Sequence, residues 1–435
     1  MSSPTNETIG KNWKAPFFTL WTGQAVSLLG SQLVQFALIW WLTKTTGSAT
    51  VLATASLVAL IPQVVLGPLV GALVDRWNRR VIMIVADSII ALVTIGLALL
   101  FLGGNVQIWQ VYLLMFVRGA AGGFHWPAMR ASTSLMVPKE HLSRIQGLNQ
   151  MLQGGMNILA APLGALLLEV LPIQGILAID VGTAMLAIVP LFFIHVPQPE
   201  RKFEGETSET KPSVWQDMLA GMRYVWSWPA LMMVIGMAVV INLLFAPAGS
   251  LQPILVTQHF NGGALQLAWM QSTWGIGMFL GGLLLSAWGG FKRRILTTFV
   301  GLIVLGAGVV VVGLAPPWAI GVAVAMTFVA GFAIPIVNGP INAVLQASVD
   351  PEMQGRVFTL VSSLAMAMSP IGLIIAGPFA DAFGVTTWYL MSGIVIVLMG
   401  VAGFFIPAVV HIEDGRSTTA QVEDGEQSVV PNTGD

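Results

Sequence analysis

Gly71-Ala72-Leu73-Val74-Asp75-Arg76-Trp77-Asn78-Arg79-Arg80 is a charged stretch that separates two long apolar runs. The first run extends from Ala49 to Val74, and the second from Val81 to Leu102. Each run is long enough to cross a bilayer, which takes about 20 apolar residues. Short loops rich in Arg and Lys stay on the cytoplasmic side of a membrane. The stretch therefore predicts two membrane-spanning helices whose connecting loop faces the cytoplasm.

The composition indicates an integral membrane protein. Of the 435 residues, 55% are hydrophobic and 9% are charged, and the mean hydropathy is +0.81. Soluble domains carry about 25% charged residues. The chain has no cysteine, which excludes disulfides, thiolate nucleophiles and cysteine-ligated metals. The first apolar run is too long for a signal-peptide core, so we expect no cleaved signal.

Twelve apolar runs have the length of a membrane-spanning helix. They cover residues 17–42, 49–73, 81–103, 108–130, 147–171, 174–196, 230–254, 265–288, 295–314, 318–345, 357–380 and 388–410. One long hydrophilic gap, 197–229, divides them six and six, and a mildly amphipathic part of it predicts a helix on the membrane surface. We predict an all-α membrane protein of 12 transmembrane helices in two pseudo-symmetric six-helix bundles, 17–196 and 230–410. A cytoplasmic N-terminal segment (1–16) and a disordered cytoplasmic tail (411–435) flank them.

The distribution of positive charge predicts the orientation. With the N-terminus in the cytoplasm, 17 of the 19 Lys and Arg residues fall on cytoplasmic segments. Only Lys44 falls outside, and only Arg118 falls within a span. A one-sided distribution of this kind is the expected signature of correctly assigned spans. Both termini are therefore predicted to be cytoplasmic.

The two predicted halves echo one another. The stretch 71–80 has a degenerate counterpart at 282–294, where Ser286 takes the place of the acid. Ala161-Pro162-Leu163-Gly164 is echoed by Ser369-Pro370-Ile371-Gly372. Parallel six-helix repeats with a substrate site between them are a known architecture of secondary transporters.

The pattern G-x-L-x-D-R-x-x-R-R at 71–80 resembles the signature between the second and third helices of major facilitator superfamily transporters. Asn78 departs from it, because the family usually has glycine there. Four further segments look like the macrolide-efflux branch of that superfamily and, more distantly, like enterobactin exporters: 23–28, 124–128, 178–181 and 355–358. The resemblance implies a bacterial plasma-membrane exporter driven by the proton gradient. It leaves the substrate open.

The resemblance also implies a gating role for Gly71, Asp75, Arg76, Arg79 and Arg80. In the family the acid sits near the start of the eleventh helix, here Gly355–Thr359, where free N–H groups and the helix dipole favour an anion. The alternative is a solvated loop acid that pairs with a neighbouring arginine.

Arg118 is the one cation predicted at mid-membrane depth. A charge there costs several kcal/mol unless it is paired or hydrated, so it is a functional candidate. The resemblance implies a part in proton transfer, and a structural ion pair is the alternative. Asp180 and Asp87 are the candidate partners, each about 10 Å into its helix. Asp180 ranks first because its predicted depth is nearer that of Arg118. A carboxyl group that moves relative to a fixed guanidinium can take up and release a proton.

Polar side chains recur at helical spacing within several spans. Amides and hydroxyls are uncommon on lipid-facing surfaces, so we expect them to line a substrate cavity, although some could simply join helix to helix. The predicted cavity residues are Gln24, Ser27, Ser31, Gln35, Gln153, Asn157, Asn242, Asn338 and Asn342.

No motif indicates an enzyme or a nucleotide-driven pump. We expect no cofactor, metal or nucleic acid, and a monomer in the lipid bilayer that handles a small molecule and protons. The favoured function is proton-coupled export of a hydrophobic or amphiphilic compound, such as a macrolide-like antibiotic. Export of a siderophore or other endogenous metabolite is an alternative. A transmembrane sensor is another, which the lack of a predicted soluble domain disfavours.

The predicted orientation can be tested by labelling. Because the chain has no cysteine, single cysteines at Lys44 and Lys292 give no background. We expect an impermeant maleimide to label position 44, and not position 292, in intact cells. Labelling of position 292 from outside would overturn the orientation.

Overall fold

The computed structural model describes residues 13–194, 196–198 and 221–414. Within them the chain forms twelve helices of 21 residues or more. They are α1 (Lys14–Thr46), α2 (Ala49–Arg76), α3 (Arg79–Leu102), α4 (Ile108–Met136), α5 (Leu142–Val170), α6 (Ile173–Phe193), α8 (Pro229–Ile254), α9 (Ala264–Trp288), α10 (Arg294–Leu314), α11 (Ile320–Ser348), α12 (Pro351–Phe383) and α13 (Val385–Phe405). Short helical segments cover Lys139–His141, Leu255–His259, α14 (Pro407–Val410) and Ile412–Asp414. Most of the predicted segments 1–16, 197–229 and 411–435 lies outside the described residues.

Ten helices of the described chain are long and apolar enough to cross a membrane. The two long helices outside this set are α4 and α9. Helix α4 carries Arg118, His125 and Arg130, and α9 carries Gln266 and Gln271. These polar residues lower the mean hydropathy, so the prediction of twelve spans stays a prediction for α4 and α9.

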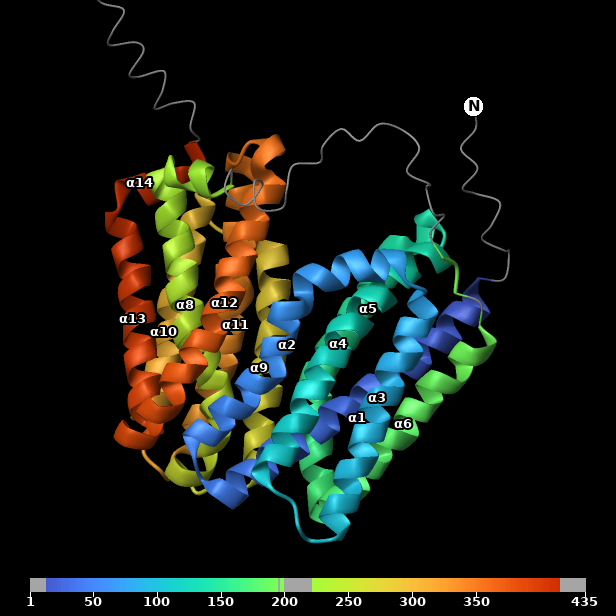
Figure 1. Ribbon diagram of the computed structural model, residues 1–435. Helices are drawn as coiled ribbons and strands as arrows, with labels where there is room; N and C mark the ends of the chain where they lie inside the picture. Colours follow the sequence, from blue (N-terminus) through green and yellow to red (C-terminus); the bar gives the residue numbers. More distant parts are fainter. Residues whose placement is uncertain (1–12, 195, 199–220, 415–435) are drawn as a thin grey trace, which may run out of the picture.

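The helices pack as two groups (Figure 1), and the main contacts within one group have equivalents in the other. In the first group α1 contacts α5 and α6, and α4 contacts α2 and α3. In the second group α8 contacts α12 and α13, and α11 contacts α9 and α10. Helix α2 packs on α12 and helix α5 on α9, which joins the groups through equivalent pairs. We call these groups the first and second half.

Asn78 begins α3 as its N-cap. Its side-chain oxygen accepts hydrogen bonds from the backbone N–H of Arg80 (3.0 Å) and of Val81 (3.3 Å). Asparagine is among the best N-cap residues because it satisfies N–H groups that lack a partner within the helix. The residue that departs from the family signature thus has a local structural reason.

Glycine allows two helices to approach closely at equivalent places in the two halves. A Cβ on Gly119 of α4 would overlap the carbonyl oxygen of Ala59 on α2. A Cβ on Gly331 of α11 would likewise overlap the carbonyl oxygen of Trp274 on α9. The residue before Gly119 is Arg118, so this close packing also fixes where the guanidinium enters the first half.

We expect Gly119→Ala to destabilise the protein by ~1–3 kcal/mol, the usual cost of overfilling a packed site. Gly122→Ala on the same helix is the matched control, because no atom lies within 4 Å of a Cβ there. The measurement is the thermal unfolding midpoint of the purified proteins. Equal midpoints for the two variants would contradict the close contact.

Candidate functional site

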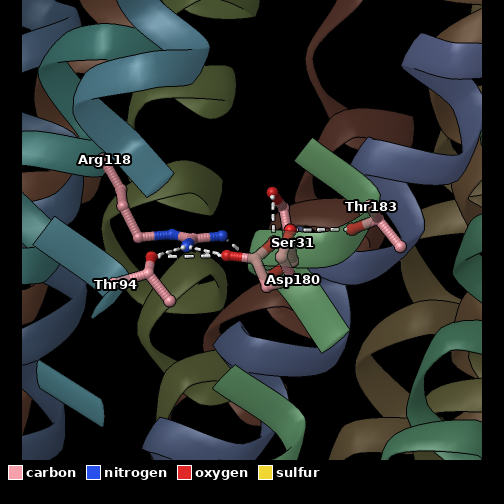
Figure 2. Close-up of polar contacts among 5 residues, drawn as sticks. All are labelled: Ser31, Thr94, Arg118, Asp180 and Thr183. Carbon is pink, nitrogen blue, oxygen red and sulfur yellow. Dashed lines mark hydrogen bonds and ion pairs between the residues drawn. The ribbon is translucent and has the colours of Figure 1, made fainter. Parts of the chain in front are cut away.

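Arg118 and Asp180 form a buried ion pair inside the first half (Figure 2). The guanidinium Nη1 of Arg118 lies 2.6 Å from Oδ2 of Asp180 and donates to the Thr94 hydroxyl at 3.0 Å. The Ser31 hydroxyl donates to Oδ1 of Asp180 at 3.2 Å. The cluster, which we call the arginine layer, therefore takes one residue from each of α1, α3, α4 and α6.

Burial makes this pair energetically important. The side chain of Arg118 is 10% exposed and that of Asp180 is 2% exposed. Breaking a buried pair by removing one partner typically costs about 3–5 kcal/mol, because the other charge stays behind uncompensated. Gly30 lets α1 approach α6 here, since a Cβ on it would overlap the Thr183 hydroxyl next to Asp180. The fold is thus built to close around the pair.

Asp87, the second candidate partner of Arg118, lies in a different cluster. It is 5% exposed and accepts a hydrogen bond of 3.1 Å from Gln24. Its Oδ1 lies 3.4 Å from Nε2 of His125, a buried residue of α4. We call this cluster the histidine layer. Sequence reasoning missed His125, although its spacing of seven residues from Arg118 on one helix was a usable signal.

A cavity of about 450 Å³ lies between the two halves. Its walls are mostly apolar and aromatic, and its polar lining consists of amides and hydroxyls: Gln32, Gln35, Asn157, Gln252, Gln271, Thr327 and Tyr389. The lining residues of the described chain include no Asp, Glu, Lys, Arg or His. Such a site can bind a ligand through apolar contacts and neutral hydrogen bonds.

A second cavity of about 310 Å³ lies within the second half and contains Asn242, Asn338 and Asn342. Phe245 and Ala246 line both cavities. The Phe245 ring stacks on Trp274 with 5.6 Å between the centroids, so this aromatic pair stands where the two cavities adjoin. The two cavities therefore form adjacent compartments with an aromatic boundary.

The predicted cavity residues separate into two sets. Gln35 and Asn157 line the first cavity, and the three asparagines line the second. Gln24 and Ser31 instead contact the buried acids Asp87 and Asp180. Ser27 is buried, and neither Ser27 nor Gln153 lines either cavity. Helix α1 therefore has polar residues in two different environments. Gln24 and Ser31 contact buried acids, whereas Gln35 lines the cavity between the halves.

Comparison with known proteins gives the family. The model of the Major Facilitator Superfamily matches residues 20–372 and 244–431 of this chain. The chain belongs to the major facilitator superfamily. It is 34% identical to macrolide efflux protein A of Streptococcus pyogenes over 390 residues, which are 90% of this chain and 95% of that protein. It is 27% identical to the multidrug efflux pump Tap of Mycolicibacterium fortuitum over 87% of this chain and 92% of Tap.

Solved structures agree on the fold. A bacterial homologue of the human lysosomal transporter Spinster, described as inward-facing and unoccupied, matches with a TM-score of 0.66 and 14% identity. The match covers 93% of this chain and 99% of that one. Together with the family, the apolar helices identify a multi-pass membrane transporter of small molecules.

In this major facilitator the arginines after Asp75 hold the first half together. Arg79 is buried, and its Nη1 donates to the carbonyl of Ala131 near the end of α4 (2.8 Å). Arg80 donates to the carbonyl of Phe192 near the end of α6 (2.6 Å). Arg76 is exposed. The side chain of Asp75 lies outside the described part of the structure, so the gating role of Gly71 and Asp75 stays a prediction.

Asp381 joins the two halves at the opposite end of the bundle. This α12 residue accepts hydrogen bonds from the Ser48 hydroxyl (2.8 Å) and from the backbone N–H of Ala49 (2.7 Å) and Thr50 (3.0 Å). The N–H groups of Ala49 and Thr50 lie in the first turn of α2 and have no acceptor within that helix. The helix dipole favours a negative charge at this position. We call this contact the Asp381 latch.

We expect Asp381→Asn to favour separation of the halves at this end. Loss of the charge weakens three hydrogen bonds, and about 1 kcal/mol shifts two populations several-fold. Spin labels at Lys44 and Leu314, both exposed at this end, report the separation by electron–electron distance measurement. Glu169→Gln, an exposed acid at the end of α5, is the control. Identical distance distributions for Asp381→Asn and the unsubstituted protein would refute the latch.

Proposed function

We propose that this transporter exports a hydrophobic or amphiphilic compound, such as a macrolide-like antibiotic, in exchange for protons. The observation that carries the transport step is the cavity between the halves, with its apolar walls and neutral amides. A volume of about 450 Å³ is in the usual range for drug-sized ligands. The relatives named as macrolide and multidrug efflux proteins support the direction of transport and the substrate class.

The proposed coupling group is Asp180. A proton on Asp180 removes the negative charge beside Arg118 and so weakens the ion pair that joins α4 to α6. Arg118 keeps its charge, since guanidinium groups do not deprotonate in proteins. Protonation therefore changes the net charge of the arginine layer by one unit. With Asp180 protonated, the arginine layer has a net positive charge and favours hydration. With Asp180 ionised, the layer has no net charge and favours burial. Proton binding can therefore bias the bundle between two conformations.

Alternating access then consists of rocking the two bundles, 17–196 and 230–410, around the cavity. The Asp381 latch closes one end, which the distribution of Lys and Arg predicts to be the outer end. Asp75 is proposed to hold the cytoplasmic end closed in the opposite state. The cavity lies within one chain, so a monomer in the bacterial plasma membrane suffices.

The alternatives fit less well. An anionic siderophore would gain from a cationic partner, and the described lining residues of the first cavity provide none. Export of a neutral endogenous metabolite is compatible with the same lining and remains the second candidate. The sensor alternative loses support because the chain belongs to a transporter family.

Expression in an efflux-deficient bacterium tests the proposal. We expect the unsubstituted protein to raise the tolerated concentration of macrolides several-fold and to lower their accumulation. Collapse of the proton gradient with an uncoupler should abolish the difference. A panel of unrelated drugs and an iron-chelating siderophore distinguishes the substrate classes. Unchanged macrolide tolerance with exported siderophore would favour the alternative.

The coupling group is tested with Asp180→Asn in vesicles. We expect this variant to lose export against a gradient while movement down a gradient stays measurable, because the cavity residues are unchanged and asparagine cannot take up the proton. Since Arg118 also loses its counter-charge, the thermal unfolding midpoint of the variant is measured first to establish that it folds. Gln153→Leu on α5, which lines neither cavity, is the control for altered packing. Normal uphill export by Asp180→Asn would remove Asp180 from the coupling mechanism.

A further inference from the structure

The two buried polar layers of the first half repeat each other at a fixed spacing. On α1, Gln24 precedes Ser31 by seven residues, and on α3, Asp87 precedes Thr94 by seven. On α4, which runs in the opposite direction, His125 follows Arg118 by seven. Seven residues are two helical turns, or about 10 Å. The histidine layer therefore lies two turns below the arginine layer, on the same three helices and nearer the end that carries Arg79 and Arg80.

The histidine layer is sealed and incompletely satisfied. Gln24 is 1% exposed, Asp87 is 5% and His125 is 6%. The amide of Gln24 donates to one carboxylate oxygen of Asp87. Nε2 of His125 lies 3.4 Å from the other oxygen, yet it forms no hydrogen bond with any described residue. A buried polar atom in this position is costly unless a small rearrangement or a proton completes the contact.

The charge of the pair explains what it can do. An ionised Asp87 beside a neutral His125 would leave one negative charge inside the bundle, at a cost of several kcal/mol. One shared proton makes the pair neutral, whether imidazolium faces carboxylate or imidazole faces carboxylic acid. The sealed pair therefore keeps one proton, and it can release that proton once water reaches it. Imidazole is the side chain suited to such exchange within the physiological pH range.

We propose that His125 and Asp87 form a second protonation site, which passes a proton between water at the Arg79 end and Asp180. The step balances: the donor pair loses one proton and becomes negative, and Asp180 gains it, which leaves the arginine layer positive. The distance of about 10 Å exceeds one hydrogen bond, so water admitted during opening carries the proton between the layers. The proposal rests on the proposed coupling through Asp180.

Few other charges face the pair. Of the helices around His125, α1 contributes the neutral Gln24, α3 contributes Asp87 and Arg79, and α6 contributes Asp180. On α4 itself, Arg118 and Arg130 lie at distances of seven and five residues. At the end of α2, Arg76 is exposed. Asp87 is the one ionisable side chain in contact with His125 within the described chain, which makes it the matched variant for a test.

The first test follows the imidazole itself. In the full-length protein with ¹⁵N-labelled histidine, the His125 signal is identified by its loss in His125→Gln. We expect this signal to change with pH, and the change to differ in Asp87→Asn, because the carboxylate that faces the imidazole is then gone. His141→Gln, at a partly exposed position just before α5, should leave the signal unchanged. A His125 signal that does not change with pH, or a pH dependence that is the same in Asp87→Asn, overturns the proposal. If His125→Gln does not fold, the signal that moves in Asp87→Asn serves instead.

The second test measures export against a gradient in vesicles between pH 6 and 8. We expect His125→Gln to retain uphill export with a rate several-fold lower and a flatter pH dependence, whereas His141→Gln keeps the original profile. A profile unchanged in His125→Gln overturns the relay and leaves coupling through Asp180 intact. If instead the unsubstituted protein cannot pump, the proposed function fails, and the imidazole titration still decides whether the pair binds a proton.

Discussion

A charged guanidinium inside a membrane protein has to be neutralised where it lies, and the pair of Arg118 and Asp180 meets that requirement with four helices. Neither charge can leave the pair cheaply, because each is almost fully buried. Gly119, next to Arg118 in the sequence, brings α4 against α2, and Gly30 brings α1 against α6 beside Asp180. In the first half, close helix packing and neutralisation of the buried charge therefore depend on neighbouring residues.

The two halves share helix contacts and differ in chemistry. The first half carries the ionisable layers, whereas the described part of the second half offers asparagines and an aromatic wall to its cavity. At the place equivalent to Arg118 and Gly119, the second half has Ala330 and Gly331. Both halves have a glycine at this place because both have two helices in close contact there. The second half has no arginine there, because helix packing alone does not require a charge. The buried ionisable groups and the two cavities thus occupy different parts of one repeated scaffold.

Much of the fold could be predicted from the sequence, because apolar run length, loop charge and the 71–80 stretch each report on single helices or loops. The choice between Asp180 and Asp87 as neighbour of Arg118 was harder. It depends on which helices touch, and depth estimates alone favoured Asp180 only weakly. His125 was missed because a lone histidine on an apolar helix attracts no attention by itself, and only its spacing of seven residues from Arg118 pointed to it. Gln24 and Ser31 were assigned to the cavity because helical periodicity gives a face and not the identity of the facing helix.

The Asp381 latch has a consequence for the secondary structure of α2. Ala49 and Thr50 have no acceptor for their N–H groups within the helix, so Asp381 completes the start of α2 only while the halves are together. If that end opens in the proposed transport cycle, these amides would have to turn to water, and the first turn would become prone to fraying. Amide hydrogen exchange at the beginning of α2 would then follow the conformational cycle, since local protection reports the fraction of time that a hydrogen bond is broken. Exchange at the start of α2 would therefore report what fraction of the time this end of the bundle is open.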